Sequence, residues 1–305
     1  MNQNLEKQMK SICKLNAHND SFQTRKTYRI RMNRFLEWAS LRGLQKLQNI
    51  SNKQMSAYIN QELDRGISER TLKSTLCAIR HYNRVACLLS KTESRLNISN
   101  EVLGIGGKST FQYREGVSED EYFEALKTCA NDFEMISAIR LGYILGLRSN
   151  EIFNLRMYEL RDAIRSENHQ IHIDHGTKGG RKRVVEFDEK YTDELTDIFE
   201  SAKKCGKRLS DKVLCKNEKG ECKRQLARWH NFWSRYGARI ANNANSNRAT
   251  PLSAHCLRRQ YSRNMFNKLL EDGMNEKKAA SNISEWLGHG RSRKDITALY
   301  LGVRV

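Results

Sequence analysis

The sequence predicts a mainly α-helical protein with a small β-sheet, built as two domains. Apolar residues recur at three- and four-residue steps along most of the chain, which is the pattern of helices with one buried face. Only one proline, Pro251, occurs in 305 residues, so long helices can run without interruption. Two β-rich runs flank a turn in HQIHIDHGTKGGRKRVVEF, residues 169–187, and predict a hairpin. The length is about twice that of a common single domain, which favours two separate cores.

The first 92 residues predict a helical domain. One helix is expected over residues 24–41, where most apolar residues lie three or four positions apart. Ser51 and Ser68 each precede a further helical pattern, as N-cap residues do, and Gly66 separates the two helices. Residues 1–92 are therefore expected to form one unit of packed helices.

A second domain is expected from residue 118 to residue 305. The helical pattern lapses over residues 93–117, where GIGGKST places three glycines within four residues, and this stretch is interpreted as a linker. Ser118 and Glu121 then have the spacing of a capping box and predict the start of a helix. Further helices are expected up to about residue 147, from residue 150, and over residues 191–204, 222–242, 253–269, 276–288 and 292–300.

The charge of the chain indicates a polyanionic partner. It carries 54 Lys and Arg against 35 Asp and Glu, a net charge of +19. Residues 1–92 hold 17 basic and 6 acidic residues, a net +11, so the first domain is the more basic per residue. Its helix faces carry candidate contacts to a phosphate backbone, although a solvated helical face would show the same pattern. These candidates are Arg25, Lys26, Arg29, Arg34, Lys73, Arg80 and Arg84.

Two protein classes are not supported by the sequence. The longest apolar stretch, residues 136–147, is shorter than a membrane span and contains Arg140. The first ten residues, MNQNLEKQMK, lack the apolar core of a signal peptide, so a cytoplasmic location, in the cytosol or the nucleoid, is expected. Eight cysteines form no CxxC pair, and the spacing of Cys215, Cys222 and His230 differs from that of common zinc fingers. No metal and no other cofactor is expected.

Three polar residues stand beside predicted buried helices. His255 and Arg258 are three positions apart in HCLRRQYS and point the same way from one helical turn, with Ser253 as the expected N-cap. Alone, this pair could simply lie on the surface. Arg148 lies where a buried helix gives way to a short one, so it either meets an anion or caps the preceding helix.

Four motifs taken together resemble the tyrosine recombinase or phage integrase family. GLRSNEIFNLR, TKGGRKRVVEF, SAHCLRRQYS and WLGHGRSRKDITALY follow one another in this order behind a basic helical unit. The resemblance covers essentially the whole chain. It implies that residues 1–92 are a SAM-like, core-binding DNA-binding domain and that residues 118–305 are an α+β tyrosine recombinase catalytic domain.

The resemblance also assigns roles to single residues. It implies a catalytic set of two arginines, a lysine at the hairpin turn, the HxxR histidine, a second histidine and a tyrosine nucleophile, with an acidic residue supporting the site. The matching positions are Arg148, Arg258, Lys178, His255, His289, Tyr300 and Glu151. Two simpler interpretations stay open: TKGG is only a hairpin turn, or LGHG is only the end of a helix.

The chemistry of these residue types agrees with the family's reaction. Two guanidinium groups can bind the non-bridging oxygens of a phosphodiester under attack and stay charged at any working pH. A 3′-phosphotyrosine keeps the energy of the broken bond, so rejoining needs neither ATP nor a metal. The resemblance thus implies a site-specific recombinase for integration or excision of a mobile element, acting on double-stranded DNA as a homotetramer, with accessory DNA-bending proteins among its partners. The alternatives are a catalytically inactive DNA-binding accessory protein and an activity like that of type IB topoisomerases.

Overall fold

The computed structural model describes residues 3–15, 22–106, 114–290, 298 and 300–302. The chain divides into two compact units, Met1–Thr110 and Phe111–Val305, each with a hydrophobic core of its own. Each unit is described by itself. The predicted fold class is confirmed, since the described residues are mostly helical and include one two-stranded sheet.

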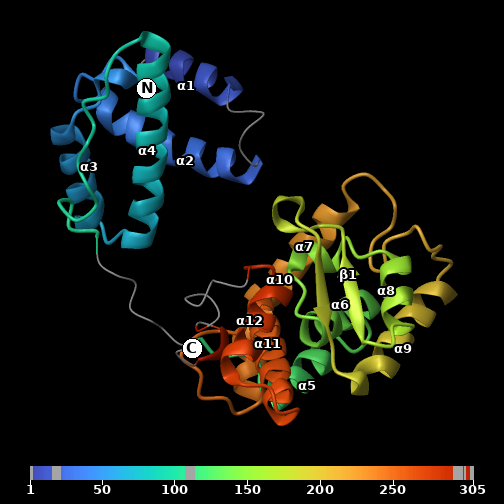
Figure 1. Ribbon diagram of the computed structural model, residues 1–305. Coiled ribbons are helices and arrows are strands. Elements are labelled where there is room, and N and C mark those ends of the chain that lie inside the picture. Colours follow the sequence, from blue (N-terminus) through green and yellow to red (C-terminus); the bar gives the residue numbers. More distant parts are fainter. Residues whose placement is uncertain (1–2, 16–21, 107–113, 291–297, 299, 303–305) are drawn as a thin grey trace. The chain divides into compact units, whose positions relative to one another are not determined.

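The first unit is a bundle of helices around a core of apolar side chains such as Phe35, Leu36 and Leu76 (Figure 1). The expected caps are confirmed: Ser51 forms a capping box with Gln54, and the Ser68 hydroxyl accepts from the Thr71 N–H. The first helix of the unit was not predicted as a separate element. The elements are α1 (Gln3–Leu15), α2 (Phe22–Ser40), the 3-10 turn η1 (Leu47–Asn49), α3 (Asn52–Asp64) and α4 (Glu69–Ser90).

The start of the expected linker packs against this first unit. Leu103 and Ile105 are buried in its core, at 5% and 0% exposure. The guanidinium of Arg80 donates to the carbonyl of Ile98 and to Oδ1 of Asn100, at 2.6 and 2.8 Å. Arg80, expected as a phosphate contact, is therefore used inside the unit, because its side chain holds this extended segment against α4.

The second unit surrounds a two-stranded antiparallel sheet with helices. Its strands pair from Gln170 with Glu186 to Ile173 with Arg183, as the hairpin pattern predicts. The capping box of Ser118 and Glu121 is confirmed. The elements are α5 (Glu119–Thr128), α6 (Phe133–Ile144), α7 (Ser149–Ile152), α8 (Met157–Ile164), β1 (Gln170–Ile173), η2 (Lys178–Gly180), β2 (Arg183–Glu186), η3 (Glu189–Tyr191), α9 (Thr192–Lys204), α10 (Glu221–Asn243), α11 (Ala254–Glu271) and α12 (Glu276–Trp286).

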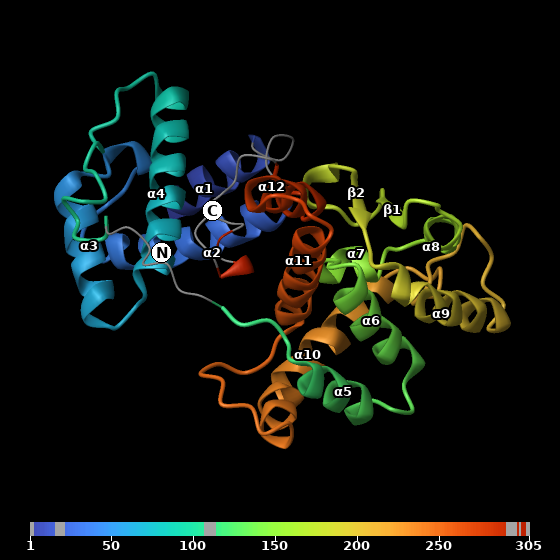
Figure 2. The ribbon, with the colours of Figure 1, turned by 60° about the horizontal axis from the view of Figure 1, so that its bottom comes forward.

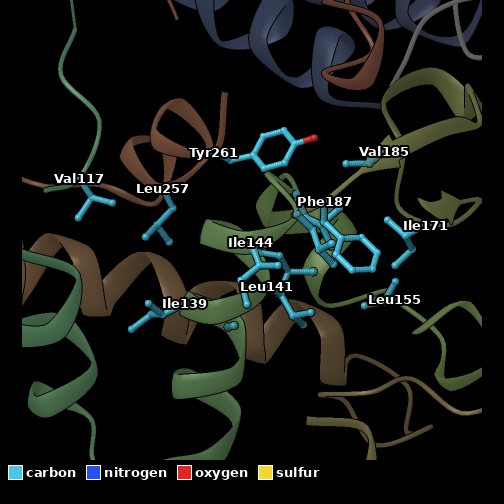
Figure 3. Packing of buried hydrophobic residues seen from close by; sticks show 14 of the residues in the cluster. Val117, Ile139, Leu141, Ile144, Leu155, Ile171, Val185, Phe187, Leu257 and Tyr261 are labelled. Carbon is cyan, nitrogen blue, oxygen red and sulfur yellow. The ribbon is translucent and has the colours of Figure 1, made fainter. Parts of the chain in front are cut away.

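Helix α6 lies at the centre of this unit and packs against α11 (Figure 2). Gly142 lets the two helices approach closely, because a Cβ there would lie 3.0 Å from a methyl carbon of Leu257. Figure 3 shows Leu257 and Tyr261 of α11 among the core residues that also include Ile144 of α6. The hydroxyl of Tyr261 donates to the carbonyl of Glu186 at 2.6 Å, which ties α11 to the end of β2.

One expected cap differs in detail. Ser253 is the N-cap residue of α11, but its side chain makes no capping hydrogen bond within the part of the chain that the structure describes. Its Oγ lies 3.5 Å from Sγ of Cys256 instead.

Most of the helix expected over residues 292–300 lies outside the described residues. Among the residues described, no helix has the length and apolar character needed to cross a membrane.

Candidate active site

The site begins at the turn between α6 and α7. Arg148 is the N-cap residue of α7, and its backbone N–H donates to Oε2 of Glu151 at 2.7 Å. The guanidinium of Arg148 also donates to Oε1 of the same carboxylate at 2.8 Å. Glu151 is fully buried. The short helix therefore fixes the carboxylate, and the carboxylate in turn orients Arg148.

A second arginine comes from α11 and lies beneath the first. Arg258 is 1% exposed, and its two terminal nitrogens donate to the carbonyls of Gly146 and Leu287. Arg148 donates to the same Leu287 carbonyl at 2.7 Å. Leu287 is the C-cap of α12, so one oxygen at the negative end of a helix dipole accepts from both arginines.

A third arginine at this place was missed by the sequence analysis. Arg183 of β2 is an ion-pair partner of Glu151 at 2.5 Å, with the two side chains 5% and 0% exposed. It also donates to the carbonyl of Trp286. The sequence holds one signal for it: Val185 and Phe187 follow Arg183 by two and four positions, and residues at this spacing in a strand share a face. Val185 and Phe187 are both buried, so Arg183 lies on the inner face of the strand.

The three arginines control the charge of the site. Burial alone would raise the pKa of Glu151, but the charges of Arg183, Arg258 and Arg148 outweigh burial and hold this pKa below its usual value. Burial and then the charges of Arg183 and Arg148 lower the pKa of Arg258 to about 10, so it stays charged at neutral pH. Three guanidinium groups and one carboxylate leave a surplus of two positive charges.

Tyr300 lies against the histidine of the HxxR pair in the same chain. Its hydroxyl is 2.7 Å from Nε2 of His255, and the two ring centroids are 5.4 Å apart. Tyr300 is 6% exposed, whereas His255 is exposed. Loss of water around part of the His255 ring, followed by the charges of Arg259 and Arg258, lowers the pKa of His255 to about 4. His255 is therefore neutral at pH 7, and Nε2 can accept a proton.

His289 also lies against the ring of Tyr300, with the two ring centroids 5.3 Å apart. Burial and the charges of Arg258 and Arg148 lower the pKa of His289 to about 3. Its Nδ1 is buried and makes no hydrogen bond to any described residue. The residue before it, Gly288, has φ +67° and follows the last turn of α12, so LGHG does end a helix. The same turn also directs His289 toward Tyr300.

Most of these side chains border an open cleft of about 950 Å³, whereas Arg258 and Glu151 lie outside its lining. The backbone of Lys178 lies in η2, between the two strands, as predicted, but its side chain lies outside the described part of the structure. The cleft is lined by residues from the hairpin, α7, α11, the end of α12 and the tyrosine segment, among them Arg148, Gly179, Arg183, His255, His289 and Tyr300. Residues separated by more than 150 positions in the sequence thus meet at one place.

The other candidates differ in accessibility. On the first unit, Lys26, Arg29, Arg34 and Arg84 are exposed. The ammonium of Lys73 lies 4.0 Å from Glu69, and Arg25 is partly buried. Within the described ranges, no group of three His, Cys, Asp or Glu side chains is placed to hold a metal ion.

Models of known protein families match both units of the chain. The model of the integrase family matches residues 104–264, more than half of the chain, and the model of the phage integrase N-terminal SAM-like domain matches residues 15–88. No curated protein sequence matches significantly.

Solved structures share the fold at low sequence identity. A XerH recombinase in a post-cleavage complex with a palindromic difH substrate has a TM-score of 0.65 and 19% identity, over 97% of this chain and 80% of that chain. The Tn1549 transposon integrase with circular intermediate DNA has a TM-score of 0.61 and 15% identity, over 96% and 94%. A lambda integrase dimer on a COC′ core site has a TM-score of 0.61 and 15% identity, over 97% and 77%. Because the integrase family model matches more than half of the chain and the SAM-like domain model matches the first unit, the chain belongs to the phage integrase family of tyrosine-type site-specific recombinases.

Proposed function

We propose that this recombinase cuts and rejoins duplex DNA with Tyr300 as the nucleophile, for the integration or excision of a mobile element. The observation that supports the nucleophile is its 2.7 Å contact with Nε2 of His255, beside the cluster of arginines around the buried Glu151. Since both residues belong to one chain, each protomer would supply its own nucleophile to its own site.

Arg148 and Arg258 would bind the scissile phosphate. In the transition state the non-bridging oxygens carry more negative charge than in the substrate, and fixed guanidinium donors favour that increase. Arg258 keeps N–H groups free beyond its two carbonyl contacts, because a guanidinium has five. Leu287 and Gly146 thus hold the arginine, and its remaining donors serve the phosphate.

His255 would take the proton of the attacking hydroxyl. The Tyr300 oxygen forms a bond to phosphorus, its proton passes to Nε2 of His255, and the bond from phosphorus to the 5′-oxygen breaks. Burial is the largest cause of the low pKa of His255, and the charges of nearby arginines lower it further. A bound phosphodiester partly neutralises these charges and so raises the pKa of His255 toward that of a useful base.

The leaving 5′-oxygen needs a proton. By family resemblance we assign this role to Lys178, on the turn that joins β1 and β2. His289, whose ring also lies against Tyr300, would hydrogen-bond the phosphate. The reverse reaction, attack of a 5′-hydroxyl on the phosphotyrosine, rejoins the strand without ATP.

The assembly follows from the number of cuts. Two duplexes require four strand cuts, and each chain offers one nucleophile, so we propose a homotetramer on DNA, formed with or without accessory DNA-bending proteins, in the cytoplasm. The XerH, Tn1549 and lambda proteins are described as DNA complexes, which supports DNA as the partner. Residues 1–92 would contribute phosphate contacts from the exposed Lys26, Arg29, Arg34 and Arg84.

The test uses end-labelled duplex DNA from the two flanks of the gene, nicked so that a cut strand diffuses away. The wild-type chain should form a covalent protein–DNA adduct that survives denaturation. Tyr300→Phe should form none and still bind the DNA, since only the attacking oxygen is removed. Tyr236→Phe on α10 is the matched control and should form the adduct normally. An adduct in the Tyr300→Phe variant would disprove the assignment, and binding without an adduct in the wild type would favour an accessory protein.

A further inference from the structure

We propose that Arg183 is a positioning residue of the active site: it compensates the charge of Glu151, so that Arg148 and Arg258 keep their full positive charge for the phosphate. This proposal rests on the function proposed above. It gives a role to a residue on β2 that does not itself need to touch the DNA.

The contacts of Arg183 point inward. One terminal nitrogen donates to Oε2 of Glu151, the other donates to the carbonyl of Trp286, and the side chain is 5% exposed. Its Nε is buried and has no partner among the described residues. Gly288 adjoins the side-chain stem, since a Cβ there would lie 3.1 Å from Cδ of Arg183. The guanidinium is thus held between the carboxylate and the end of α12.

The carboxylate is shared among three cations. Arg183 lies 2.5 Å from it, Arg148 lies 2.8 Å away, and Arg258 lies 4.0 Å away. Glu151 gains its position from Arg148, yet its negative charge opposes the binding of a phosphate at the same place. Arg183 removes this conflict, because it is the closest of the three cations to the carboxylate.

The charge count gives the reason for a third arginine. A phosphodiester carries one negative charge, and the five-coordinate state formed by attack of a tyrosinate carries two. With Arg183 the cluster has a surplus of two positive charges, which matches the transition state. Without Arg183 the surplus is one, which matches the substrate. Positive charge accelerates the reaction only if it stabilises the transition state more than it stabilises the bound substrate.

The test compares single-turnover cleavage of the nicked flank DNA by the wild type, Arg183→Met, Glu151→Gln and the double variant. Arg183→Met should slow adduct formation by about 10- to 100-fold, as expected for loss of a supporting partner. Adding Glu151→Gln removes the uncompensated charge, so the double variant should be faster than Arg183→Met alone. Arg183→Lys should keep part of the rate. Lys203→Met on α9, an exposed lysine remote from these contacts, is the charge-matched control and should cleave normally.

Two results would overturn the proposal: a wild-type rate in Arg183→Met, or a double variant no faster than that single variant. A purely structural role predicts the second result, because deleting the carboxylate would not restore packing.

A readout without DNA separates this proposal from the function on which it rests. In ¹³C NMR of labelled glutamate carboxylates, the resonance that Glu151→Gln removes should titrate at a higher pH in Arg183→Met than in the wild type. An unchanged midpoint would overturn the role of Arg183 even if the recombinase assignment holds. A shifted midpoint without any adduct in the wild type would count against the recombinase function alone.

Discussion

Replacing Gly146 by alanine should both destabilise the second unit and displace Arg258, one of the two arginines that we propose as ligands of the phosphate. Gly146 has φ +56°, and an added Cβ would lie 2.2 Å from Cδ1 of Tyr261. The Tyr261 ring cannot move aside freely, because it is 1% exposed and its hydroxyl is bonded to the carbonyl of Glu186. The Gly146 carbonyl also accepts from Arg258, so a backbone shift there displaces that guanidinium.

The size of the effect is the sum of two costs. An alanine in the left-handed region costs about 1–2 kcal/mol. Overpacking of a filled core costs about 1–3 kcal/mol more. Gly273→Ala is the matched control: Gly273 has φ +84°, and a Cβ there would meet no atom within 4 Å among the described residues. Gly273→Ala should therefore lower the free energy of unfolding by only the first of the two costs, about 1–2 kcal/mol.

Urea unfolding followed by tryptophan fluorescence measures this difference. Three of the four tryptophans, Trp229, Trp233 and Trp286, lie in the second unit, so the signal reports mainly on that unit. Adduct formation on the flank DNA should also fall in Gly146→Ala and not in Gly273→Ala. Equal free energies of unfolding for the two variants would show that the Tyr261 ring accommodates the methyl group, and the reasoning would fail.

Two further predictions concern charge. The pKa values of His255 and His289 in the folded chain, about 4 and about 3, lie below the unfolded value of 6.5. At a pH between the folded and the unfolded values, the unfolded chain therefore binds more protons than the folded chain. Stability should therefore fall as the pH is lowered from about 6.5 toward 4, and urea unfolding of His289→Gln should lose less stability over this window than the wild type; an equal loss would contradict the lowered pKa. Arg258→Lys should slow adduct formation by about 100-fold or more while DNA binding changes little, because an ammonium cannot bond both carbonyls and the phosphate in one plane; near-normal cleavage would show that charge alone suffices there.

Much of the fold follows from local signals in the sequence. The caps at Ser51, Ser68 and Ser118 were predicted, since a hydroxyl at a helix start bonds the chain within three residues of itself. The hairpin was predicted because its two strands follow each other in the chain and are joined by one turn. The packing of Leu103 and Ile105 onto the first unit was not, because it depends on contacts such as that of Arg80 with Ile98.

The candidate site, too, could be predicted from the sequence only in part. The motifs identified the arginines, histidines and tyrosine one by one, and the structure brings those of them that it describes together. Arg183 escaped notice because a single arginine in a basic stretch resembles a solvated one. Its spacing to Val185 and Phe187 indicates an inward position, but its partner Glu151 is identified only by the tertiary contact. The shared acceptor at Leu287 could not be predicted either, since a backbone carbonyl leaves no mark in the sequence.

That shared acceptor links the two arginines that we propose as ligands of the phosphate. Arg148 and Arg258 come from different helices, yet both bond the one oxygen at the end of α12. A displacement of the last turn of α12 would therefore remove one hydrogen bond from each arginine at the same time, while Arg148 keeps its contact with Glu151 and Arg258 keeps the Gly146 carbonyl. His289, which lies against the Tyr300 ring, comes two residues after Leu287 in the chain. The same displacement would therefore also move the histidine beside the proposed nucleophile.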